Sequence, residues 1–158
     1  MLFRCLLLPL LAVFAIVLSP AAKAASPEGL WLVEDQTGRI KIQKCGGQMW
    51  VFVGWQKAPK NDTENPNPAR HGKPLVGTPI LIGMKPVGED RYEGDIYNPR
   101  NGKVYKSKMV VLPSGKLQIK GCVLGGLICG GEDWVKLPED PAINAKVACA
   151  NAQSPLSR

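Results

Sequence analysis

Hydrophobic residues alternate with polar residues along most of this chain, and this period of two constrains the fold more than any other feature. Alternation puts every second side chain on one face of a β-strand, whereas an amphipathic helix needs apolar positions three and four apart. Ile40 and Ile42, for example, occupy alternate positions between polar neighbours, and no amphipathic helix stands out. The pattern predicts eight strands, over residues 28–34, 38–45, 48–56, 79–84, 90–98, 103–112, 116–123 and 128–137.

Short turn signals, mostly glycine pairs, Asn-Gly or Pro-Ser-Gly, separate these strands. Eight short strands joined by tight turns predict an all-β fold, a small antiparallel up-and-down barrel whose closure removes the exposed sheet edges. One connection is different: residues 57–78 form a long loop with four prolines. Loops of this length are usually functional or disordered. Because prolines restrict the backbone, we expect an ordered lid at the barrel rim.

Charge selects the register of the hairpin formed by residues 90–98 and 103–112. If the turn is centred after Arg100, two acid–lysine pairs face each other on one side of the sheet. These pairs are Asp95 with Lys106 and Glu93 with Lys108. A slip of one residue would mix the polar and apolar faces. The residues that this register turns inward are Tyr92, Ile96, Tyr105 and Met109.

The first 24 residues have the layout of a secretory signal peptide. Arg4 precedes an apolar run that ends at Leu18, and Ala22 and Ala24 lie three and one positions before the expected cut. The run is short for a bilayer span, which takes about 20 apolar residues, and an uncleaved anchor is the alternative. We therefore expect a signal peptide at 1–24, a barrel domain at 25–137 and a tail at 138–158. The predicted location is the periplasm, with secretion as the alternative.

Four cysteines remain after the predicted cleavage, an even number that suggests two disulfides in an oxidising compartment. Three connectivities are open. With Gly125-Gly126 as a two-residue turn, Cys122 lies opposite Cys129, at about 5.5 Å between Cα atoms if the pair is hydrogen-bonded. Cys45–Cys149 then follows by elimination. Because the second bridge closes a much longer loop, we expect it to stabilise the fold more.

Residues 48–56 break the alternation, because both faces of this strand are apolar. One face fills the barrel, and the other needs a cover. The candidates are the tail after Leu137, an envelope protein, or a second copy of the chain, and we favour a segment of the same chain. The tail itself is rich in small residues, and we expect it to be loosely attached apart from Cys149.

Several segments together resemble a bacterial family. They are Gly29-Leu30-Trp31, Cys45-Gly46-Gly47, residues 65–70 with 74–77, residues 92–99 with 102–105, and residues 121–131 with Trp134. Across residues 28–137, this order and spacing resembles the exported domain-of-unknown-function family 2147. The resemblance implies a lipocalin-like (calycin) barrel in which Gly29 and Trp31 close the floor and Lys136 packs on Trp31. It implies no reaction, cofactor or catalytic residue.

The sequence has no pattern typical of a catalytic or metal centre. A hydrolase triad needs a base, usually histidine, and the one histidine, His71, lies in the long loop. A glycosidase needs paired carboxylates across a cleft, and Asp95 and Glu93 are explained by their lysines. We expect no enzyme, with an envelope hydrolase as the minor alternative, and no cofactor or metal. The net charge of +7 is spread over single lysines, which suits a solvated surface rather than a nucleic-acid interface.

These observations predict a periplasmic lipocalin-like protein that binds a small apolar or amphipathic molecule of the cell envelope. Arg70 either faces an anionic head group or forms a staple with Asp62, and the four inward residues line an apolar interior. Because the strands are short, we expect any cavity to be small. The alternative is a filled barrel that acts as a structural or protein-interaction module through strand 48–56 and loop 57–78. A homodimer or an envelope-protein partner suits that alternative, and neither function spans the membrane.

Overall fold

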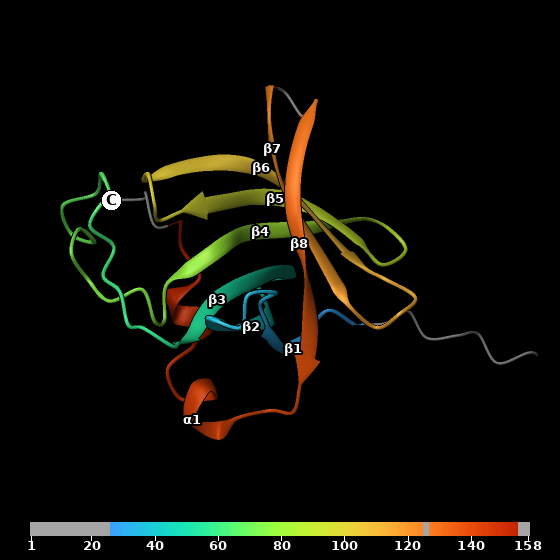
Figure 1. The fold of residues 1–158 in the computed structure, drawn as a ribbon, viewed down its shortest axis with the longest axis horizontal. Helices are drawn as coiled ribbons and strands as arrows, with labels where there is room; N and C mark the ends of the chain where they lie inside the picture. Colours follow the sequence, from blue (N-terminus) through green and yellow to red (C-terminus); the bar gives the residue numbers. More distant parts are fainter. Residues whose placement is uncertain (1–25, 125–126, 155–158) are drawn as a thin grey trace, which may run out of the picture.

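The computed structural model describes residues 26–124 and 127–154. Its strands follow one another in chain order and close into an antiparallel barrel, with β8 paired back onto β1 (Figure 1). The strands are β1 (Gly29–Leu32), β2 (Gly38–Cys45), β3 (Gln48–Gln56), β4 (Pro79–Gly88), β5 (Arg91–Asn98), β6 (Lys103–Val111), β7 (Leu117–Val123) and β8 (Ile128–Leu137). Two short helical turns follow, α1 (Pro141–Asn144) and η2 (Cys149–Asn151).

The predicted all-β barrel is confirmed, and the predicted strands match the observed ones closely. The largest difference is in β4, which continues to Gly88 because Gly83 adopts a left-handed conformation (φ +56°) and the register shifts between Ile82 and Lys85. No helix of residues 26–124 and 127–154 is long and apolar enough to cross a membrane. The predicted signal peptide and the Gly125-Gly126 turn lie outside the described residues.

The register predicted for β5 and β6 is confirmed: both acid–lysine pairs face each other, and the inward residues pair as Tyr92 with Met109 and Ile96 with Tyr105. Lys106 Nζ lies 2.8 Å from Asp95 Oδ1, and Lys108 Nζ lies 3.6 Å from Glu93 Oε1. These lysines are largely exposed, so each ion pair contributes little stability. The opposite face contributes more of the stability of the hairpin, because Met109 is fully buried there and Tyr92 and Ile96 pack against the core.

The barrel floor lies where β1 begins and β8 ends. Trp31 is buried there, and its Nε1 donates a 2.8 Å hydrogen bond to the Pro27 carbonyl oxygen. Lys136, directly opposite Trp31 in the β1–β8 pair, holds its Nζ 5.2 Å from the Trp31 ring centroid. Gly29 has a φ of +126°, and a Cβ there would lie 3.2 Å from Lys136 Cε, so glycine suits both the backbone and the contact. The contact implied by the family resemblance is present.

The C-terminal tail covers the outer face of β3 (Figure 1). Ile143 of α1 and Val147 are buried there against Leu30 and Phe52, and the indoles of β3 pack around them. Ion pairs hold the start of the tail to β2: Arg39 with Asp140, and Lys41 with Glu139. The tail is therefore an integral layer of the fold. The expectation of a loose tail was wrong, because Ile143 and Val147 anchor it although most of its other residues are small.

Both predicted disulfides are present, Cys45–Cys149 and Cys122–Cys129. The first ties the end of the tail to the end of β2, across 104 residues. The second crosses the β7–β8 hairpin, with 4.1 Å between the Cα atoms. This separation is shorter than the expected 5.5 Å and lies nearer the value of about 4.5 Å for a non-hydrogen-bonded pair. Two disulfides are typical of an exported protein in an oxidising compartment.

Candidate functional site

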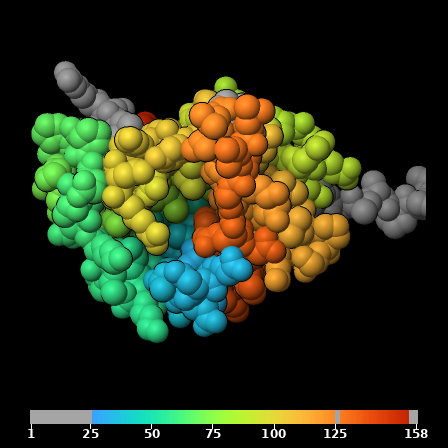
Figure 2. All heavy atoms as spheres, turned by 45° about the horizontal axis from the view of Figure 1, so that its top comes forward, coloured from blue at the N-terminus to red at the C-terminus, as the bar shows by residue number. Residues whose placement is uncertain are grey.

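The end of the barrel opposite the Trp31 floor is open. A cavity of about 1080 Å³ enters the barrel there, and Figure 2 shows its mouth as a hollow between the segments coloured blue, green, yellow and orange. Four connections surround it: the β1–β2 turn, loop 57–78, the β5–β6 turn and the β7–β8 hairpin. In an up-and-down meander, every second connection lies at the same end, so these four segments meet by topology alone.

The walls of the cavity are mainly aliphatic and aromatic. They are formed by Ile40, Val53, Ile80, Ile96, Ile119 and Trp134. The cavity is much larger than expected for strands of this length. One reason is that Gly121 and Gly130, which lie directly opposite each other on β7 and β8, line it and have no side chains to fill the mouth, whereas the lower half of the barrel is packed.

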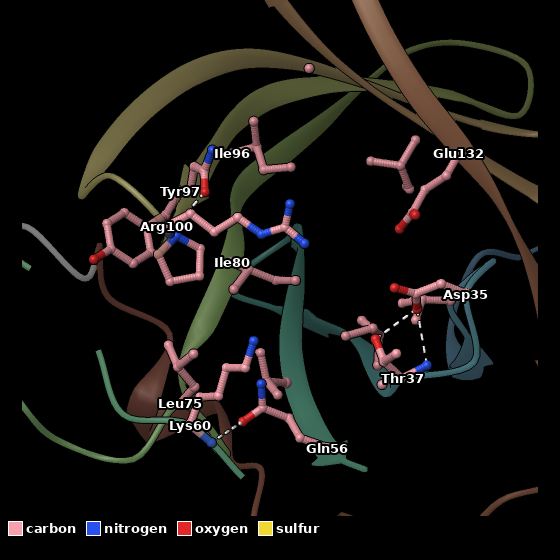
Figure 3. Close-up of a pocket in the computed structure, with 18 of the residues that line it drawn as sticks. Asp35, Thr37, Gln56, Lys60, Leu75, Ile80, Ile96, Tyr97, Arg100 and Glu132 are labelled. Carbon is pink, nitrogen blue, oxygen red and sulfur yellow. Dashed lines mark hydrogen bonds between the residues drawn. The ribbon is translucent and has the colours of Figure 1, made fainter. Parts of the chain in front are cut away.

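Charged side chains stand around the mouth. Figure 3 shows the Arg100 guanidinium reaching into the cavity from the β5–β6 turn, with Asp35 and Glu132 on the opposite side and Lys60 below. Arg100 and Lys60 therefore lie on one side of the rim, where loop 57–78 also brings Glu64, and Asp35 and Glu132 lie on the other. The cations and anions face each other across the opening without a direct ion pair among them.

The two carboxylates at the rim already have hydrogen-bond donors. Asp35 Oδ1 accepts from Thr37 Oγ1 at 2.6 Å and from Thr37 N at 2.9 Å (Figure 3). These bonds lower the Asp35 pKa, and the Arg100 charge is a smaller cause in the same direction. Glu132 Oε1 accepts from Trp134 Nε1 at 2.5 Å. Both acids are therefore held in place, and Arg100 is the rim group that points into open space.

Loop 57–78 forms one side of the mouth and is anchored by a buried carboxylate. Asp62 is 2% exposed and accepts hydrogen bonds from Tyr97 Oη at 2.6 Å and from Asn65 Nδ2 at 2.8 Å. Burial, followed by the bond to Asp62, raises the Tyr97 pKa far above its usual value. The loop also touches the β5–β6 turn, since a Cβ on Gly102 would lie 2.0 Å from the Glu64 carbonyl oxygen. The ordered rim position predicted for the loop agrees with this arrangement.

The structure brings only some of the predicted binding residues to the cavity. Ile96 and Tyr105 line it, as their inward register implies. Met109 is fully buried in the packed core, and Tyr92 borders a separate shallow pocket with Arg91 and Lys108. The side chains of the predicted interior therefore divide between the cavity and the core.

The predicted staple between Asp62 and Arg70 was wrong. The Asp62 carboxylate bonds Tyr97 and Asn65 instead, because Tyr97 lies on the outer face of β5 and the loop folds over it. Arg70 is half-buried in a separate turn of the loop, where its amide donates to the Asn67 carbonyl at 2.9 Å, and it does not line the cavity. Arg70 therefore does not occupy the head-group position.

Sequence reasoning missed Arg100, Asp35, Lys60 and Glu132. The signal for these residues was available in the predicted order of the strands. Asp35, Lys60 and Arg100 each lie in a connection at the same end of the meander, and charged residues at such positions surround the barrel mouth. Glu132 lies within β8, opposite Ile119. His71 is exposed, and its Nδ1 lies 3.1 Å from the Asn65 carbonyl oxygen. Within the described part of the chain, no three His, Cys, Asp or Glu side chains gather as metal ligands.

Comparisons with known proteins support this architecture. A family model described as an uncharacterized protein conserved in bacteria, DUF2147, matches residues 29–136. Among solved structures, the chain is similar to protein HP1028 from the human pathogen Helicobacter pylori, which is described as belonging to the lipocalin family. The two share 20% sequence identity with a TM-score of 0.64, and the match covers 75% of this chain and 87% of that one. A search of curated proteins found no match.

Proposed function

This chain belongs to the DUF2147 family and folds as a lipocalin-like barrel, and from that premise we propose that it is a periplasmic binding protein for a small amphipathic molecule of the cell envelope. The observation that carries the proposal is the open cavity of about 1080 Å³, which has apolar walls and a charged mouth. Ligand sites in proteins typically measure about 300–1,000 Å³ and combine apolar walls with a few polar groups.

The two zones of the cavity suit the two ends of one ligand. An acyl or other apolar part would displace water from the walls formed by Ile96 and Ile119, which is favourable by about 25 cal/mol per Å² of apolar surface buried. An acidic head group would remain at the mouth and meet Arg100, with Lys60 nearby. Arg100 thus takes the role that the sequence suggested for Arg70.

The proposed periplasmic location depends on the signal-peptide layout of residues 1–24 and on the two disulfides. Binding without catalysis is the simpler proposal for this site. The rim acids Asp35 and Glu132 accept hydrogen bonds from Thr37 and Trp134, which gives both carboxylates a structural role.

The alternative function, an interaction module that acts through the outer face of β3, is not supported. The tail already covers that face, where Phe52 is fully buried beneath Ile143 and Val147. The barrel is also not filled at its open end, because the cavity extends to Ile119 and Trp134. Loop 57–78 lies beside the opening, where it suits a role in admitting a ligand.

A titration with a fluorescent fatty acid below its micellar concentration tests the proposal. The wild type should bind it, and Arg100→Gln should weaken binding about tenfold, as expected for one lost charge-assisted hydrogen bond. Arg70→Gln is the matched control and should bind like the wild type. The corresponding fatty alcohol should bind both arginine variants equally, and Ile96→Trp, which narrows the cavity, should weaken the binding of both probes. A folded wild type that binds neither probe would overturn the proposal.

A further inference from the structure

Four large aliphatic side chains at the end of the β7–β8 hairpin are exposed, and the name hairpin tip refers to these four described residues: Val123, Leu124, Leu127 and Ile128. Val123 is 42% exposed, Leu124 69%, Leu127 86% and Ile128 58%. In Figure 1 this hairpin rises above the rest of the barrel. The other large exposed aliphatic residues of the described chain, Val87, Val104 and Val135, are single and lie on β4, on β6 and near the far end of β8. Apolar side chains that gather at one protruding tip indicate an interaction site.

The hairpin is stiffened next to this tip. The Cys122–Cys129 bridge joins the two strands at the pair adjoining Val123 and Ile128. The bridge contributes little to the core, because Cys129 is exposed and the closed loop is short. The bridge does keep the aliphatic residues together on a narrow projection. This lowers the conformational entropy that is lost when they bind to another surface.

Three lysines lie below the tip on the outer face of the sheet. Lys106 is paired with Cys122 in the β6–β7 ladder, and Lys108 is paired with Lys120. Lys106 and Lys108 also contact Asp95 and Glu93, whereas Lys120 has no ion-pair partner among residues 26–124 and 127–154. An aliphatic tip above Lys120, whose positive charge is not paired within the described chain, is complementary to a lipid bilayer with anionic head groups, into which apolar side chains insert by about 5–10 Å.

The size and shape of the tip favour a bilayer over a protein partner. A stable protein interface buries about 800 Å² on each side and needs a matching surface. Four side chains on a narrow convex hairpin fall well short of that area. A bilayer needs no matching shape, and its apolar interior accepts leucine, isoleucine and valine directly.

We propose that the β7–β8 hairpin tip inserts into the surface of an anionic lipid bilayer and holds the cavity mouth against it. Val123, Gly130 and Gly131 of this hairpin also line the cavity, so the inserted tip and the opening are continuous (Figure 2). The inference deepens the proposed function by naming the lipid surface from which an amphipathic ligand enters. The entry route of the ligand rests on the proposed function, whereas insertion of the tip does not.

Flotation of the full mature chain with vesicles tests the tip directly. The wild type should float with phosphatidylcholine vesicles that contain phosphatidylglycerol, and more weakly with phosphatidylcholine alone. The triple variant Leu124→Ser, Leu127→Ser, Ile128→Ser should lose at least about tenfold in partition coefficient, because three exposed aliphatic side chains no longer insert. The control, Val87→Ser with Val135→Ser, removes aliphatic side chains that are 51% and 50% exposed elsewhere on the barrel, and it should float like the wild type. Lys120→Glu should weaken binding only to the anionic vesicles.

Three results would overturn the inference: a wild type that floats with neither vesicle, control variants that lose as much binding as the tip variant, or a dimer in light scattering that the triple variant abolishes. A fatty-acid titration without vesicles separates this inference from the proposed function. The triple variant should keep wild-type affinity there. If the wild type binds the fatty acid but no vesicle, only the membrane inference fails. If it floats through the tip but binds no fatty acid, only the proposed function fails.

Discussion

Tyr97 Oη donates a 2.6 Å hydrogen bond to Asp62 Oδ1, and this contact joins the end of β5 to loop 57–78 across 35 residues of chain. Both side chains are buried, and Asn65 holds the second carboxylate oxygen. The bond fixes one side of the cavity mouth. A loop without this anchor would be free to move across the opening, so the contact connects the stability of the fold with access to the site.

Replacing Tyr97 with phenylalanine should lower the free energy of unfolding by about 1–3 kcal/mol, because it leaves a buried carboxylate oxygen of Asp62 without its donor. Urea denaturation with the disulfides intact measures this change. Tyr105→Phe is the matched control. It removes a more exposed hydroxyl that accepts a 2.8 Å bond from Asn101 Nδ2, and it should cost well under about 1 kcal/mol. Equal losses in the two variants would contradict the anchor.

The raised pKa of the Tyr97 phenol predicts that the protein loses stability at alkaline pH. Burial and the bond to Asp62 raise the Tyr97 pKa above its ordinary value of 10, so the folded protein favours the neutral phenol. A raised pKa contributes stability that is fully present below pH 10 and is lost as the pH rises above it. Unfolding measured on both sides of pH 10 should show a steeper loss for the wild type than for Tyr97→Phe. The variant keeps a smaller slope, because burial also raises the Tyr92 pKa.

Removal of the two disulfides should have unequal effects. The Cys45–Cys149 bridge closes a loop of 104 residues, and the Cys122–Cys129 bridge one of 7. In the chain-entropy model, loss of the long-range bridge costs about 2 kcal/mol more than loss of the local one. Paired cysteine-to-serine variants, compared by urea denaturation, check this order. Non-reducing peptide mapping checks the pairing itself, and a peptide joining Cys45 to Cys122 or Cys129 would show that the assignment is wrong.

Ile143→Ala should lower the free energy of unfolding by about 2–4 kcal/mol, because Ile143 is buried over the outer face of β3. Gly54 lies beneath it, and a Cβ on Gly54 would meet Ile143 Cγ2 at 2.5 Å. Gly54→Ala should therefore destabilise the wild type more than it destabilises the Ile143→Ala variant. Additive losses would mean that the tail does not rest on Gly54. Ala142→Ser, on the exposed side of α1, should stay within about 0.5 kcal/mol of the wild type.

Export by a cleaved signal peptide predicts one defined N-terminus. N-terminal sequencing of the periplasmic fraction should begin at Ala25, or within a residue or two of it. A substitution of Ala24 by a bulky residue should slow processing, because small residues are required before the cut. Recovery of the full-length chain from the membrane fraction would support an uncleaved anchor instead.

The sequence by itself determined the strands, the hairpin register and the local disulfide. Each of these depends on neighbours within one hairpin. Alternation assigns faces, opposite charges such as Asp95 and Lys106 align the two strands, and a two-residue turn sets Cys122 opposite Cys129. The barrel closure also followed from the strand order, and the Trp31–Lys136 contact from the family resemblance. These features were predictable because short-range geometry leaves few alternatives.

Only the tertiary structure determined the size of the cavity, the charged residues at its mouth, and the positions of loop 57–78 and the C-terminal tail on the outside of the barrel. The Asp62–Tyr97 bond depends on how a long loop folds over the outside of β5, and alternation within a strand carries no information on that path. The size of the cavity depends on Gly121 and Gly130, which lie opposite each other on neighbouring strands, and the tail's place over β3 depends on Ile143 reaching Gly54. Contacts between distant segments are selected by the packing of the whole barrel, since no local rule ranks one distant partner above another.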